Sequence, residues 1–207
     1  MTKLKKLEFL EIIKGILFNP KEFIPLIAKK SINESINLWL VPLILIFGFY
    51  SIAVFLSPSI AYDNPFASNS IILFLVNLFG FFISNYIISV LINFVAKLFG
   101  EKDSKEKIFS VLIAIETIAI IIIYPLNALV KGFVWSPLLD LGFIVIIGLP
   151  LGIYRIYLEI KGISLIYKID LFKALTILVL TYVLGAVLLV ILAMFSLPLI
   201  GGIFPWN

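Results

Sequence analysis

Long uncharged stretches separated by short charged ones dominate the pattern of this chain. Five stretches with no charge or a single charge reach about 18 residues, enough for a helix to cross about 30 Å of hydrocarbon. They predict spans at about residues 36–57, 71–96, 108–130, 136–155 and 171–197. We therefore expect an all-α polytopic membrane protein: a bundle of five transmembrane helices preceded by a short cytoplasmic amphipathic segment, residues 1–35.

The first 35 residues follow a different pattern, in which lysines and glutamates alternate with apolar residues at helical spacing. The apolar positions are Leu4, Leu7, Leu10, Ile13 and Leu17. This spacing predicts an amphipathic helix that lies on the cytoplasmic face of the membrane. Asn19 and Pro20 then suit the cap and first position of a second helix, whose regularity Pro25 limits.

The distribution of positive charge orients the predicted spans. When five helices alternate, all of the 16 Lys and Arg residues except Lys131 fall on one side of the membrane. The positive-inside rule assigns that side to the cytoplasm, so the N-terminus lies inside and the C-terminus outside. The fourth span is the least apolar, because it holds Asp140 and Pro150. Ser136 as cap and Pro137 as first residue place Asp140 in a first helical turn, where a carboxylate is favoured.

The amino-acid composition excludes several classes of function. Apolar residues make up 62% of the chain and charged residues 14%, against about half and a quarter in soluble domains. The chain has no cysteine and no histidine, which excludes thiolate nucleophiles, histidine zinc sites and Ser-His dyads. We expect no catalytic residues, no metal, no cofactor and no nucleic-acid partner. An enzyme would need a carboxylate or Ser/Lys pair, and no spacing here supports one.

Three stretches carry a family resemblance. Residues 17–23, with Asn19, Pro20 and Phe23 in an Asn-Pro-x-x-Phe element, and residues 97–112 and 161–174 resemble prokaryotic Yip1-domain membrane proteins. The resemblance suggests an archaeal member, and the composition, rich in Ile and Lys, is typical of an AT-rich prokaryotic source. The resemblance implies five spans, a plasma-membrane location and a non-catalytic adaptor or scaffold. The chain departs from eukaryotic members at Ile113-Ala114, where they have Gly-Tyr, so their role with Rab-type GTPases is not transferred.

Glu116 is the sharpest single feature inside the predicted spans. It lies nine residues past Lys107, hence about 13 Å along the helix at 1.5 Å per residue, close to the middle of the membrane. An ionised carboxylate at that depth is costly, so it should be protonated, paired or facing water. A proton- or cation-linked site and a structural hydrogen bond both remain open. No second buried charge is expected to accompany it.

Polar residues in the second predicted span are the other intramembrane candidates. These are Asn77, Ser84, Asn85, Ser89 and Asn93. Asn85, Ser89 and Asn93 are spaced by four and share one helix face, where such side chains hydrogen-bond across helices. A polar pathway facing Glu116 is the alternative interpretation.

Glycines mark the fourth span as a packing helix. Gly148 and Gly152 are four residues apart and allow the backbones of two helices to approach closely. Such a contact also leaves open a homo-oligomer. Pro150 between them should bend the helix.

Two functions therefore remain. The first is a membrane adaptor or scaffold that binds the lipid bilayer and a membrane or cytoplasmic protein, with Asn19, Pro20 and Phe23 as partner- or lipid-facing candidates. The second is a small transporter or channel that uses Glu116 with the amides of the second span.

Overall fold

The computed structural model describes residues 9–56, 70–133 and 144–203, and these fold as helices with no strand among them. Two short helices come first, α1 (Phe9–Phe18) and α2 (Pro20–Ile27). The longer elements are α3 (Ile32–Leu56), α4 (Ser70–Leu98), α5 (Lys105–Phe133), the π-helical turn η3 (Ile144–Gly148), α7 (Leu149–Tyr167) and α8 (Leu171–Ile203). The all-helical class predicted from the sequence is confirmed over the described residues.

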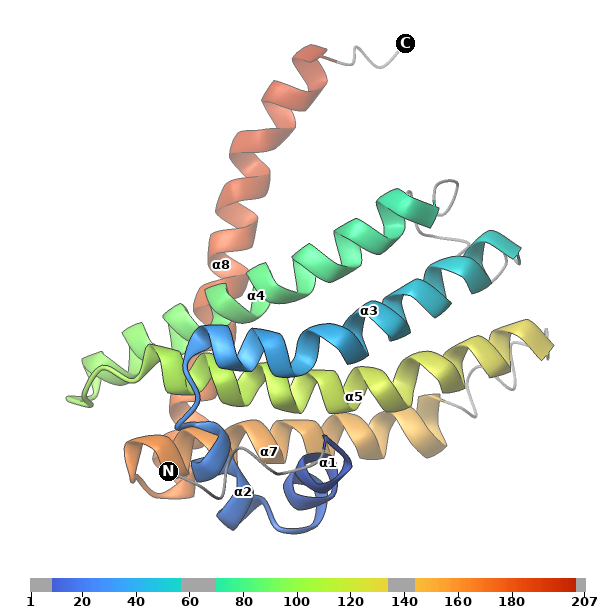
Figure 1. Cartoon of the computed structure of the whole chain (residues 1–207). Helices are drawn as coiled ribbons and strands as arrows, with labels where there is room; N and C mark the ends of the chain where they lie inside the picture. The colour runs from blue at the N-terminus through green and yellow to red at the C-terminus, as the bar shows by residue number, and fades with distance from the viewer. Residues whose placement is uncertain (1–8, 57–69, 134–143, 204–207) are drawn as a thin grey trace.

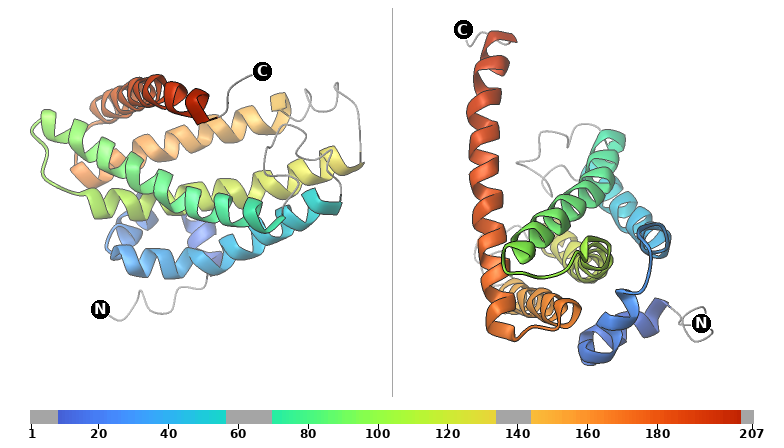
Figure 2. Two further views of the ribbon diagram at one scale, coloured as in Figure 1. Left: turned by 90° about the horizontal axis from the view of Figure 1, so that it is seen from above. Right: turned by 90° about the vertical axis from the view of Figure 1, so that its left-hand side faces the viewer.

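Helix α5 is the centre of the packing. It lies between α3, α4 and α7, as the views in Figures 1 and 2 agree, and it contacts each of them. Every residue of the stretch from Ile108 to Ile115 is buried. Neighbouring helices therefore surround this stretch of α5 on all sides.

The N-terminal helices pack against the bundle and complete its core. Ile12 and Ile16 of α1, with Ile24 and Ile27 of α2, are buried in the same cluster as Trp39 and Phe109. The ring of Phe9 meets Trp39 edge-to-face at 5.5 Å between centroids. The Tyr154 hydroxyl donates to the carbonyl oxygen of Leu17. Part of the predicted apolar stripe is corrected here, because Leu10 is 63% exposed whereas Ile12 and Ile16 face the protein.

Helix α8 leaves the bundle part-way along its length. Its first half packs on α4 and α7 through Ala174, Ile177 and Leu178. Its second half projects away from the other helices, as Figure 1 and the right-hand view of Figure 2 show. Every residue from Ala186 to Met194 is exposed. The fifth predicted span therefore does not run alongside the other four.

Three helices are long and apolar enough to cross a membrane. They contain the stretches Ile32–Val54, Ile71–Leu98 and Leu171–Met194, and they match the first, second and fifth predicted spans. The described parts of α5 and α7 are not in this set, and they carry Glu116, Arg155 and Glu159. The length and apolarity of these three helices indicate a membrane protein. That α5 and α7 also cross the membrane stays a prediction.

Several helix ends follow their sequence signals. Helix α2 begins at Pro20 after Asn19, whose carbonyl oxygen, not its side chain, accepts the first amide bonds. Helix α8 is capped by Asp170, whose Oδ1 accepts from the Lys173 amide at 2.9 Å. The cap and first turn expected at Ser136, Pro137 and Asp140 lie outside the described residues.

Two boundaries differ from the prediction. Helix α3 begins at Ile32 and not near residue 36, because Ser31 and Glu34 form a reciprocal capping box. Helix α7 continues to Tyr167, well past the predicted end at residue 155. The expected bend at Pro150 takes the form of the π-helical turn that ends at Gly148, directly before α7.

Candidate functional site: a buried charge network between three helices

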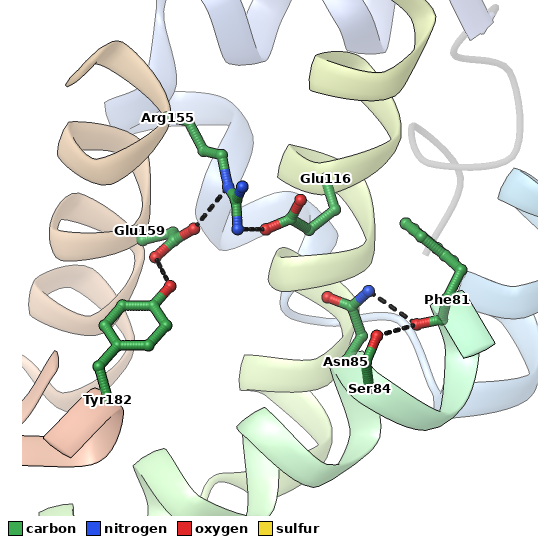
Figure 3. Close-up of polar contacts among 7 residues, drawn as sticks. All are labelled: Phe81, Ser84, Asn85, Glu116, Arg155, Glu159 and Tyr182. Atoms are coloured by element: carbon green, nitrogen blue, oxygen red, sulfur yellow. Dashed lines mark hydrogen bonds and ion pairs between the residues drawn. The ribbon is translucent and has the colours of Figure 1, made fainter. Parts of the chain in front are cut away.

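A network of four side chains joins α5, α7 and α8 (Figure 3). The Arg155 guanidinium donates through Nη2 to Glu116 on α5 and through Nε to Glu159 Oε1, at 3.0 Å. The Tyr182 hydroxyl of α8 donates to the second oxygen of the same carboxylate, Glu159 Oε2, at 2.7 Å. One guanidinium and one carboxylate of α7 thus connect the central helix to the helix that diverges.

The positions of these groups follow from the helices that carry them. Arg155 and Glu159 are four residues apart on α7 and therefore share one face of that helix. The Glu159 side chain is 1% exposed and that of Glu116 is 15% exposed, whereas Arg155 is 38% exposed. Removing either buried carboxylate from water is offset only by direct pairing, and Arg155 pairs with both of them.

This pairing corrects the expectation that no second buried charge accompanies Glu116. The sequence predicts that the fourth span ends near residue 155. Arg155 and Glu159 are therefore expected in the cytoplasmic connection that follows it. The helix continues and carries both side chains into the core. The signal available beforehand was the Arg-x-x-x-Glu spacing in a stretch that is otherwise apolar on that face.

The polar side chains of α4 mostly bond to their own helix. Asn77 donates to Leu73, Asn85 to Phe81 and Ser89 to Tyr86, each to a carbonyl oxygen three or four residues back. Ser84 shares the Phe81 oxygen with Asn85 (Figure 3). Glu116 pairs with Arg155, whereas Asn77 and Asn85 make their hydrogen bonds within α4. The polar stripe and Glu116 therefore do not form one bonded pathway.

Asn93 is different, because it links three elements. Its Oδ1 accepts from the Ser104 amide at 2.9 Å and from the Tyr167 hydroxyl at 3.0 Å. Ser104 precedes α5 and Tyr167 ends α7, so one amide fixes the ends of two helices against α4. Burial raises the pKa of Tyr167, which keeps the phenol protonated and able to donate.

The three N-terminal residues predicted to face a partner or lipid differ in whether their side chains face outward or towards the protein. Asn19 is exposed, and Pro20 is partly exposed at the start of α2. The Phe23 ring is turned towards α1 and lies over Gly15, where an added Cβ would be 2.2 Å from it. Phe23 therefore holds α1 and α2 together. Among the described residues of this segment, the most exposed apolar side chain is that of Phe18, at 84%.

Within α7, close helix packing occurs at a glycine that the sequence did not single out. Gly148 ends the π-helical turn, and an added Cβ at Gly152 would meet open space. Close approach occurs at Gly162 instead, where an added Cβ would lie 2.9 Å from Val111 Cγ1 on α5. The expected packing role of Gly152 is therefore not met within the described chain.

Other ligand-binding features are few. Among the described residues, no group of three or more Asp, Glu, His or Cys side chains is placed to hold a metal ion. An apolar groove of about 530 Å³ lies between α3 and α5 beside Phe9, and its lining includes Val41, Pro42 and Ile121. Such a groove accepts hydrocarbon and offers no polar group for catalysis.

Comparison with known proteins shows the family to which the chain belongs. The sequence model of the Yip1 domain matches residues 14–194. The chain belongs to the Yip1-domain family. The match begins inside α1 and ends in the exposed half of α8, so the second half of α1, all of α2, the charge network and most of α8 lie within the Yip1 domain. No curated protein and no solved structure matched the chain.

Proposed function

We propose that this Yip1-domain protein is a non-catalytic membrane adaptor or scaffold that binds a protein partner through the outward face of α1. The observation that carries the proposal is the pair of opposite faces on α1. Ile12 and Ile16 dock the helix on the core, while Leu10 and Phe18 are 63% and 84% exposed on its other side. Docking holds this outward face in place before a partner arrives, which reduces the entropic cost of binding.

Charge and family membership support the same role. Lys14 lies between Leu10 and Phe18 on the outward face, and Lys21 and Glu22 follow in α2, all of them exposed. Protein-binding surfaces combine exposed apolar side chains with a polar rim. Yip1-domain proteins are in general not enzymes. We place the protein in a prokaryotic plasma membrane, with α1 and α2 on the cytoplasmic side as the lysine distribution predicts.

Transport through Glu116 has less support. The Glu116 carboxylate is paired with Arg155, the amides of Asn77 and Asn85 bond to their own helix, and Asn93 bonds to Ser104 and Tyr167. A transporter would show cation- or pH-dependent flux in proteoliposomes that Glu116→Gln abolishes. We expect the variant and the wild type to show the same background flux.

The adaptor is best tested by photo-crosslinking from single positions in the native membrane. A photoreactive phenylalanine analogue replaces Phe18, and a matched variant carries it at Phe79, a 59% exposed residue of α4 inside a predicted span. We expect position 18 to yield a discrete protein adduct, identified by mass spectrometry, and position 79 to yield lipid adducts. Identical lipid adducts at both positions would contradict the proposal.

Point replacement is preferable to removing the N-terminal segment. Deletion of residues 1–25 would also remove Ile12, Ile16 and Ile24 from the core, so it would confuse loss of the partner with loss of the fold. Phe18 contributes its side chain to the surface, and replacing it leaves the buried face of α1 intact.

A further inference from the structure

The charge network lies at the point where α8 separates from the bundle. Thr181 is buried and the next residue, Tyr182, reaches Glu159, whereas every residue from Ala186 to Met194 is exposed. The Tyr182 hydroxyl thus joins α8 to α7 just before the helix diverges (Figures 1 and 3). A change in this contact would alter the direction that α8 takes.

The network has one negative charge too many. Glu116 comes from α5, Arg155 and Glu159 come from α7, and α8 contributes Tyr182. The α4 side chains drawn with the network in Figure 3, Ser84 and Asn85, are polar and uncharged. Two carboxylates therefore face one guanidinium, and an uncompensated buried charge is strongly unfavourable. A single proton held between the carboxyl groups would make the network neutral.

We propose that the network is a proton-binding latch, in which Glu116 and Glu159 hold one proton between them and its release frees α8 from α7. With the proton bound, one of the two carboxyl groups is ionised and pairs with Arg155, and the other carboxyl group is neutral. Glu159 then keeps its hydrogen bond from the Tyr182 hydroxyl. When water removes the proton, the two carboxylates repel each other, Glu159 turns away from Glu116, and its Oε2 leaves the Tyr182 hydroxyl. Arg155 is 38% exposed and is the least buried charged group of the network, so the proton would be exchanged on its side.

The latch does not depend on a partner at α1. It concerns α5, α7 and α8, and the outward face of α1 is formed by other residues. Failure of the crosslinking experiment on Phe18 would leave the latch standing, and failure of the latch would leave the adaptor standing.

The absence of cysteine makes a direct distance measurement possible. Cysteines at Val76 on α4 and Leu188 on α8, both exposed, carry spin labels in an otherwise complete chain in lipid nanodiscs. Distances are measured by double electron–electron resonance from about pH 4.5 to about pH 9.5, a range that brackets free and buried carboxyl groups. We expect two distance populations whose ratio changes with pH by up to tenfold per pH unit, as one proton requires.

Three variants and one control test the mechanism. Glu116→Gln and Glu159→Gln keep the shape of the side chains and should abolish the pH dependence, and Tyr182→Phe should leave α8 in the released position at every pH. Ser84→Ala is the control and should behave as the wild type, because Ser84 bonds only to its own helix. If one glutamine variant fails to fold, the other and Tyr182→Phe complete the test. A distance distribution that is constant with pH, or a pH dependence that survives Glu116→Gln, would overturn the latch.

Discussion

At the scale of single residues, the structure depends on a few side chains that reach between helices. Arg155 pairs with carboxylates on two helices, Asn93 joins three elements and Gly162 lets α7 approach α5. Glu116 could be recognised from the sequence because a charge inside an apolar stretch is conspicuous. Its partner could not, because the pairing depends on where α7 ends and how it packs on α5, and neither is a local property of the chain.

Two glycines of α7 give a matched test of this packing. Gly162→Ala places a Cβ 2.9 Å from Val111, and overpacking of a core costs about 1–3 kcal/mol, of which about 1 kcal/mol is returned by the better helix propensity of alanine. Gly152→Ala meets open space and should only gain that propensity. We expect thermal unfolding in detergent to show a lower Tm for the first variant and an equal or higher Tm for the second. A fall of similar size in both would contradict the placement of α7.

At the scale of helices, local signals predicted the elements and missed some of their partners. Asn19-Pro20 and Asp170 marked two helix starts correctly, since caps depend on neighbouring residues alone. The same logic would have found the Ser31–Glu34 capping box. The amphipathic segment was expected on a membrane surface, but its pattern is equally suited to a protein surface. Periodicity identifies an apolar face and does not reveal what covers it.

The docking of α1 predicts unequal effects for its two faces. Ile16 is fully buried, so Ile16→Ala should lower the free energy of unfolding by about 2–4 kcal/mol. Leu10 is 63% exposed, so Leu10→Ala should change it by less than about 0.5 kcal/mol. Limited proteolysis should release the N-terminal segment faster in the first variant only. Equal protection of both variants would show that α1 is not docked through Ile16.

The cap of α8 gives a pH-dependent prediction. The amide of Lys173 donates to Asp170 and holds the pKa of that carboxyl below its ordinary range. The cap therefore stabilises α8 above the ordinary Asp pKa, and this stability is lost as the pH falls through the folded-state value. Asp170→Ala should lower the Tm at neutral pH and show a smaller further loss in acid. Asp170→Asn, which keeps an oxygen but does not titrate, should remove this contribution to the acid dependence; a profile equal to that of the wild type would contradict the cap.

At the scale of the whole molecule, the topology depends on which segments cross the membrane. The membrane class and the family could be predicted because apolar length and motif residues are properties of the sequence. The divergence of α8 could not, because hydropathy carries no information on the angle between helices. In the described chain, three helices are long and apolar enough to cross a membrane, whereas the distribution of lysines predicts five spans.

The connection between α5 and η3 distinguishes these two topologies most directly. Single cysteines introduced at Lys131, Lys102 and Asn207 of the cysteine-free chain are labelled with an impermeant maleimide, before and after the cells are permeabilised. With five spans, positions 131 and 207 react in intact cells and position 102 reacts only after permeabilisation. Protection of position 131 in intact cells, with 207 still labelled, would show that α5 and α7 do not cross, and would contradict the account.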